Sequence, residues 1–190
     1  MCPNWCSGNV SVRGKSENVE KFCKLFIFEE EANEENSKKG KKFFARSFIH
    51  QNWKSFKKEF LGKDTADFNV DFAWSCYSCL IEGYPQDSKG ECVTLEWACK
   101  KYDVEVLINT EEMGMCFEES ISGNKNGVVN SSEEMPKYTC QKCGKEQSFP
   151  SSYSRGELED EECYNCGAYG KWFDDFKEMV EEKLNKMEKK

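Results

Sequence analysis

The stretch FNVDFAW (residues 68–74) alternates large apolar side chains with polar or small ones. A period of two is typical of a strand that buries one face against a core and exposes the other. The same alternation recurs at 9–13, with Val10 and Val12, and again at 104–108. These segments predict a sheet with one covered face, as antiparallel sheets commonly have.

Apolar residues at helical spacing separate these strands. The expected helices cover 16–26 and 92–102, and two more strands are expected at 43–49 and 115–121. The resulting order is strand, helix, strand, strand, helix, strand, strand, which contains the βαββαβ order of the ferredoxin-like fold. The sequence therefore predicts an α+β domain over residues 1–127, a ferredoxin-like antiparallel sheet with two helices and an extra strand.

Two CxxCG knuckles lie further along the chain, CQKCG at 140–144 and CYNCG at 163–167. Two thiolates in such a motif can point at one ion when the backbone turns tightly, and the following glycine permits that turn. The separation of the two pairs falls in the zinc-ribbon range. The sequence therefore predicts one structural Zn²⁺ ion, bound by Cys140, Cys143, Cys163 and Cys166. An iron–sulfur or rubredoxin-like centre, which also uses four thiolates, and a chance spacing of cysteines are the alternatives.

The knuckles define a second module. A linker is expected over 128–137, a small zinc ribbon over 138–170 and a C-terminal helix over 171–190. A module of about 30 residues is too small to hold a core without its metal, so metal removal is expected to unfold it. The C-terminal helix is expected to pack on the protein's own modules, with oligomerisation as the alternative.

Composition limits the function classes. The 190 residues include 35 acidic and 27 basic side chains, and the net charge of −8 disfavours a protein that binds nucleic acid over its whole surface. The single histidine, His50, leaves little room for histidine-dependent catalysis. The first six residues lack the basic and apolar regions of a signal peptide. We therefore expect a cytoplasmic protein with reduced thiols and no membrane segment.

The charge reverses sign between residues 38 and 63, where nine lysine or arginine side chains accompany one glutamate. This basic, aromatic insertion can bind phosphates and stack on bases, with Phe56 as a further stacking candidate. The candidate nucleic-acid-binding residues are Arg46, Trp53, Lys54, Lys57 and Lys58. The alternative is an insertion whose aromatic side chains enter the core and whose lysines are solvated.

Further cysteines form a weaker pattern. Cys76 and Cys79 make another CxxC pair, although no glycine follows either of them. Together with Cys2 and Cys6 they can build a second metal site. The alternative is that these thiols pack inward as small apolar side chains.

Several segments of the first module share a family pattern: PNWCS (3–7), VSVRG (10–14), FAWS (72–75) and the strand pair 104–110 and 115–123. They resemble the opening motif, the second signature and the C-terminal hairpin of the YubB-like family of plasmid and phage proteins, over residues 3–127. This resemblance implies a ferredoxin-like domain encoded on a mobile element, and it implies no particular reaction. Gly8 stands where the family commonly has asparagine, and the zinc ribbon is an addition to the family pattern.

The expected function is that of a non-enzymatic, zinc-binding macromolecular-interaction protein of a phage or plasmid. A host protein is the expected partner, because an acidic chain suits a basic surface and can mimic DNA. The first alternative is nucleic-acid binding through residues 38–63 and the ribbon. The second is an enzyme of unspecified reaction that uses an acidic residue such as Asp71 or Glu105, although no paired carboxylates stand out.

Overall fold

The computed structural model describes residues 4–26, 42–49, 53–82 and 91–172 of the chain. The chain divides into two compact units, 1–133 and 134–190. None of the helices within the described ranges is long and apolar enough to cross a membrane.

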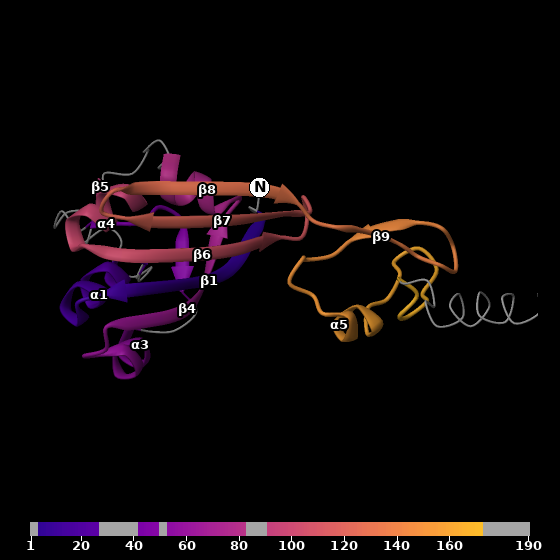
Figure 1. The fold of residues 1–190 in the computed structure, drawn as a ribbon, viewed down its shortest axis with the longest axis horizontal. Helices are drawn as coiled ribbons and strands as arrows, with labels where there is room; N and C mark the ends of the chain where they lie inside the picture. Colours follow the sequence, from indigo (N-terminus) through magenta and orange to yellow (C-terminus); the bar gives the residue numbers. More distant parts are fainter. Residues whose placement is uncertain (1–3, 27–41, 50–52, 83–90, 173–190) are drawn as a thin grey trace, which may run out of the picture. The chain divides into compact units, whose positions relative to one another are not determined.

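The first unit is built on a six-stranded sheet with the strand order β3-β4-β1-β6-β7-β8 (Figure 1). The strands are β1 (Trp5–Gly14), β3 (Ser47–Ile49), β4 (Thr65–Ala73), β6 (Val104–Glu112), β7 (Phe117–Asn124) and β8 (Gly127–Glu134). Each neighbouring pair from β3 to β7 is antiparallel. The predicted α+β class and antiparallel sheet are therefore confirmed.

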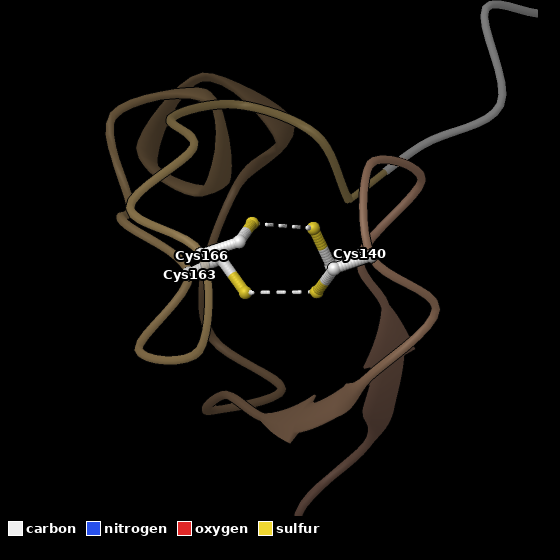
Figure 2. A group of neighbouring side chains, drawn as sticks. Cys140, Cys163 and Cys166 are labelled. Atoms are coloured by element: carbon white, nitrogen blue, oxygen red, sulfur yellow. Dashed lines mark hydrogen bonds between the residues drawn. The ribbon is translucent and has the colours of Figure 1, made fainter.

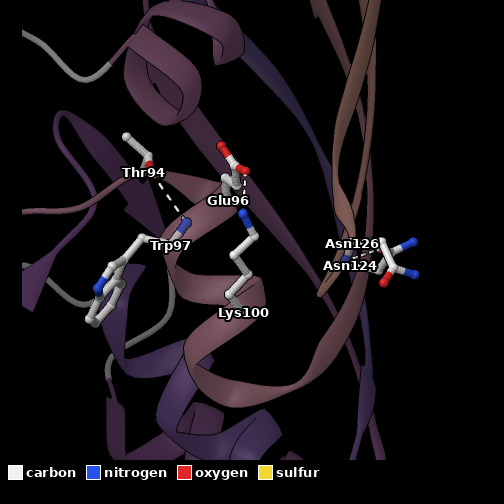
Figure 3. A network of polar contacts seen from close by, with 6 residues as sticks. All are labelled: Thr94, Glu96, Trp97, Lys100, Asn124 and Asn126. Atoms are coloured by element: carbon white, nitrogen blue, oxygen red, sulfur yellow. Dashed lines mark hydrogen bonds and ion pairs between the residues drawn. The ribbon is translucent and has the colours of Figure 1, made fainter.

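Two helices that pack against the sheet are α1 (Ser16–Cys23) and α4 (Leu95–Tyr102). Helix α4 begins where the Thr94 hydroxyl accepts a hydrogen bond from the Trp97 backbone N–H at 3.3 Å (Figure 3). A Glu96–Lys100 ion pair at 2.6 Å spans its first turns. These short-range contacts fix the start of the helix that covers β6 and β7.

Phenylalanine rings fill the space between the sheet and its helices. Phe26 contacts three of them, with ring centroids 4.6 Å from Phe44, 5.3 Å from Phe68 and 6.5 Å from Phe72. All four side chains are buried. The alternation in the stretch 68–74 therefore results from a strand with one face in this core and the other exposed.

The chain differs from the expected arrangement in three places. A further helix, α3 (Trp53–Phe60), lies between β3 and β4, so the described residues hold more helices than the two expected. The single strand expected at 43–49 is divided into β2 (Lys42–Phe43) and β3, because Arg46 turns the chain with a φ of 49°. Strand β8 occupies most of the range 128–137 that was expected to be a linker.

Two short elements complete the first unit. Strand β2 pairs in parallel with β5 (Glu91–Cys92). After β4 the chain enters a π-helical segment, η3 (Ser78–Glu82). This segment follows Trp74, whose φ of 76° turns the backbone out of the strand.

The second unit contains the hairpin of β9 (Lys137–Thr139) and β10 (Glu146–Ser148), followed by the short helix α5 (Arg155–Glu159). Ser154 and Glu157 form a capping box at the start of α5. The buried core consists of Cys140, Phe149, Leu158, Cys163 and Trp172. Trp172, expected in the C-terminal helix, thus belongs to this core, and the remainder of that predicted helix lies outside the described residues.

Candidate metal centre

The two predicted knuckles have the same backbone hydrogen bonds. The N–H of Cys140 donates to the carbonyl of Lys145 at 2.8 Å, and the N–H of Cys163 donates to that of Ala168 at 2.9 Å. The glycine that follows each pair also donates back to its first cysteine, at 2.7 Å from Gly144 and 2.8 Å from Gly167. Both glycines have positive φ, 71° and 66°, which explains why glycine follows each CxxC pair.

The knuckles bring four thiols to one point. All four sulfur atoms lie within 4.8 Å of one another, and no other such group of cysteine, histidine or acidic ligands occurs in the described part of the chain. The Sγ atoms of Cys140 and Cys166 lie 3.8 Å apart, and those of Cys143 and Cys163 lie 3.7 Å apart. Figure 2 shows Cys140 on one side of the site and Cys163 and Cys166 on the other. The site therefore joins each cysteine of one knuckle to a cysteine of the other.

These distances fit a metal ion at the centre of the group. Four sulfur atoms about 2.3 Å from one ion at tetrahedral angles lie about 3.8 Å from one another. Two of the six sulfur–sulfur separations, 3.7 and 3.8 Å, match that edge length, and all lie within 4.8 Å. With four thiolate ligands from the protein, a tetrahedral ion would have no position left for substrate.

The local electrostatics favour thiolate formation at one ligand in particular. A hydrogen bond from the backbone N–H of Lys145 is the main cause that lowers the pKa of Cys143 to about 6. Removal from water, together with the neighbouring cysteines, raises the pKa of Cys166 to about 12. One thiolate therefore forms readily, and a cation supplies the charge that favours the others.

The metal site is continuous with the small core of the second unit. Cys140 and Cys163 are buried, and the Phe149 ring lies 4.7 Å from the Trp172 ring in an edge-to-face contact. The indole N–H of Trp172 donates to the carbonyl of Glu161 at 3.1 Å. Two of the five buried side chains in this core are cysteines of the site, and the other two cysteines pack against it.

The other cysteine pair has a different environment. Cys6, Cys76 and Cys79 are buried in the first unit, but they do not meet as a ligand group within the part of the chain that is described. Burial raises the pKa of Cys6 and of Cys79 to about 12, which opposes the thiolate form that metals bind. These thiols pack inward, and Cys2 lies outside the described residues.

A buried carboxylate beside these thiols was not predicted from the sequence. Glu119 on β7 accepts a hydrogen bond from the Cys76 backbone N–H at 2.6 Å, and its Oε2 lies 3.9 Å from the Cys6 Sγ. Burial raises the pKa of Glu119. Phe117 and Ile121 share its face of β7, but Glu119 stands within the polar run Glu118–Ser120, which interrupts the apolar alternation and hides the position in the sequence.

The basic segment divides between surface and core. Lys54, Lys57 and Lys58 are exposed on α3, and the Lys57 Nζ lies 3.7 Å from a Glu20 carboxylate oxygen. Phe56 is only 2 % exposed and packs on other rings, so the prediction that it stacks on bases is wrong.

Of the remaining candidate residues, Trp53 shares α3 with these lysines and Arg46 does not. Arg46 is exposed at the turn between β2 and β3, and Trp53 begins α3. His50 lies outside the described residues. The two carboxylates suggested for an enzyme are also separated, because Asp71 pairs with Ser7 and Glu105 with Arg13, about 20 Å apart along β1.

Comparisons of the chain with protein-family models, with curated proteins and with solved structures found no match.

Proposed function

We propose that this chain is a non-enzymatic macromolecular-interaction protein whose second unit is a zinc ribbon. The observation that carries the proposal is the group of four thiols within 4.8 Å of one another, with two sulfur pairs at the edge length of a tetrahedral metal site. A hairpin that contributes one knuckle and a second knuckle facing it support the ribbon assignment. Zinc is favoured over iron because a closed four-thiolate site with no redox partner motif suits a structural ion.

Metal analysis of the purified chain tests this assignment. One equivalent of zinc per chain is expected, with no visible absorption band. Cys140→Ser is expected to lose the metal, whereas Cys116→Ser, which changes a thiol in the first unit, is expected to keep it. Stoichiometric iron, or full zinc content in Cys140→Ser, would contradict the proposal.

The strand order supports a ferredoxin-like assignment for the first unit. The strands β1, β3, β4 and β6 occur in the chain with α1 after the first and α4 before the last. They stand in the sheet as β3-β4-β1-β6, all antiparallel. This is the arrangement of a split βαβ unit, to which β7 and β8 add two strands.

The proposed setting is the cytoplasm of a host that carries a phage or plasmid, on the basis of the YubB-like resemblance. A host protein is the proposed partner, because the net charge of −8 favours a basic protein surface over a polyanion. Affinity capture from host lysate, with and without nuclease, tests this. A partner retained after nuclease treatment is expected, and capture that depends on nucleic acid would contradict it.

Nucleic-acid binding remains a second candidate because α3 presents Lys54, Lys57 and Lys58 to solvent. Phosphate binding weakens steeply with salt, so a salt-dependent mobility shift detects it. Replacement of the three lysines by glutamine should abolish that shift if α3 is the binding site. A triple replacement of Lys100, Lys125 and Lys137, three exposed lysines elsewhere, is the matched control.

A further inference from the structure

The exposed side of the sheet carries side chains that are unusual for the centre of a sheet. In the register of the central strands, Asn69, Asn9 and Asn109 stand side by side on β4, β1 and β6. All three are exposed. Asparagine is depleted in strands, so three in one row are not explained by strand stability. Such local conflicts concentrate at functional surfaces.

The neighbouring row is acidic. Asp71, Ser7, Glu111 and Glu118 stand in register across β4, β1, β6 and β7, which lie side by side in Figure 1. Like charges directly opposite each other on adjacent strands, here Glu111 and Glu118, destabilise a sheet. We call these four residues the acidic row, and no lysine or arginine belongs to it.

The net charge of this face is negative. On the same side of the central strands lie Asp67, which accepts a hydrogen bond from Ser11, and Glu105. Arg13 is the one cationic side chain on this side of strands β1, β4, β6 and β7. Together with the acidic row, the face carries five carboxylates and one guanidinium. This charge repels nucleic acid and attracts a basic ligand.

An exposed tryptophan side chain lies at the end of the face next to the acidic row. Trp5, 45 % exposed, is on the same side of β1 as Ser7. Trp74, which is 36 % exposed, follows β4. Its backbone N–H donates a hydrogen bond to the backbone carbonyl of Asn4, the residue before Trp5. Exposed tryptophan beside carboxylates is the environment that an arginine side chain fits, because the guanidinium stacks on the indole and pairs with the carboxylates.

We propose that this face, comprising the acidic row and Trp5, is the docking surface for an arginine-rich segment of a partner protein. The proposal deepens the proposed function, since it names the surface and the chemistry of the protein partner. It places the interaction on the first unit, and the zinc ribbon is not required for the contact. Charge complementarity selects a basic protein, and Trp5 supplies the apolar anchor that binding surfaces commonly contain.

A labelled peptide of alternating arginine and serine residues is the probe, used with the full chain in fluorescence anisotropy. The face variant Asp71→Asn/Glu111→Gln/Glu118→Gln is expected to bind it about tenfold or more weakly than the wild type, equivalent to about 1.4 kcal/mol. The control variant Glu17→Gln/Glu96→Gln/Asp103→Asn makes the same charge change at exposed positions of other elements and is expected to change affinity less than about twofold.

Trp5→Ala tests the apolar part of the contact independently of the charges, because it leaves every charged side chain in place. It is expected to weaken peptide binding, and Trp5→Phe is expected to restore part of the affinity. Amide shifts of the wild-type chain on peptide addition map the contact without any variant. They are expected on β1, β4, β6 and β7.

Several results would overturn the proposal. In the anisotropy experiment, these are equal weakening of peptide binding in the face and control variants, or tighter binding of a labelled DNA duplex than of the peptide. Amide shifts confined to other elements, or self-association of the chain that the face variant abolishes, would also overturn it. Zinc content measured on the same samples separates the two proposals. If the chain contains zinc but does not bind the peptide, only the docking proposal is wrong. If the chain binds the peptide but contains no zinc, only the metal assignment is wrong.

Discussion

Gly8 has the least room for a side chain among the described glycines. A Cβ atom at this position would lie 2.1 Å from the carbonyl oxygen of Asn109 and 2.6 Å from a methyl carbon of Thr110. The backbone atoms of the neighbouring strand β6 cannot move aside as the end of a flexible side chain can. Gly8→Ala is therefore expected to lower the free energy of unfolding of the first unit by about 1–3 kcal/mol, measured by denaturant unfolding.

Gly156→Ala is the control for that substitution. The nearest atom to a Cβ at Gly156 is the Ser154 Oγ at 3.9 Å, and the residue lies within α5. Alanine is the better helix former, so stability is expected to stay equal or to rise. A Gly8→Ala variant as stable as the wild type would show that the strands separate at little cost.

The pKa of Cys143 predicts how the affinity of the site for a metal ion depends on pH. Metals bind thiolates, so protons compete and affinity falls as pH falls. Because the pKa of Cys143 is about 6, this ligand is already ionised above that pH and must lose a proton on binding below it. Affinity measured by chelator competition should fall by about an extra factor of ten per pH unit below about pH 6. An unchanged slope through that pH would contradict the assignment.

At the scale of single residues, the sequence identified the four cysteines because their spacing and following glycines have a geometric cause. The same backbone turn recurs at Gly144 and Gly167, which a pattern can register. Glu119 has no such signature. Its burial depends on the distant Cys76 backbone, a contact that only the folded sheet creates.

At the scale of elements, the strands with one buried face were predictable, because burial on one side produces alternation. Strand β8 was not, since the residues of VVNSSEE are half-buried or exposed and show no alternation. The division between β2 and β3 was also missed, because Phe44 and Ala45 are both buried in the turn and continue the apolar run. Periodicity therefore detects elements that contact the core and misses edges and turns.

Glu119 links β7 to the segment that follows β4, and its pKa gives a testable pH dependence. Burial raises this pKa above the ordinary 4.5, so the folded unit retains a proton that the unfolded chain has lost. Stability of the first unit should therefore decrease as pH rises from about 4.5 through the raised pKa. Denaturant unfolding at several pH values should show this dependence in the wild type and not in Glu119→Gln.

Glu119→Ala tests the hydrogen bond separately from the charge. It removes the acceptor of the Cys76 N–H and leaves that buried donor unpaired, at a cost of about 1–3 kcal/mol. Glu118→Ala, which changes the neighbouring half-buried residue on the other side of β7, is the control. Equal stability of the two variants would mean that Glu119 does not hold the segment after β4.

At the scale of the whole molecule, the chain combines a unit with a large core of its own and a smaller unit that we expect to depend on metal. The first unit has a large cluster of buried side chains, among them six phenylalanines. The second has a cluster of only five buried side chains, two of which are metal-ligand candidates. Sequence length and composition predicted this division, because a module of about 30 residues cannot bury enough apolar surface alone. Length and composition did not place the boundary between the two units, because the residues of β8 were expected to form a linker.

The central claim is that a metal ion holds the second unit together, and amide NMR spectra of the full chain before and after chelation test it most directly. We predict that residues 134–172 lose their dispersed resonances when the chelator is added and regain them with added zinc. The resonances of β1, β4 and β6 should remain unchanged. A second unit whose spectrum is unaffected by chelation, in a sample shown to have lost its metal, would contradict the account.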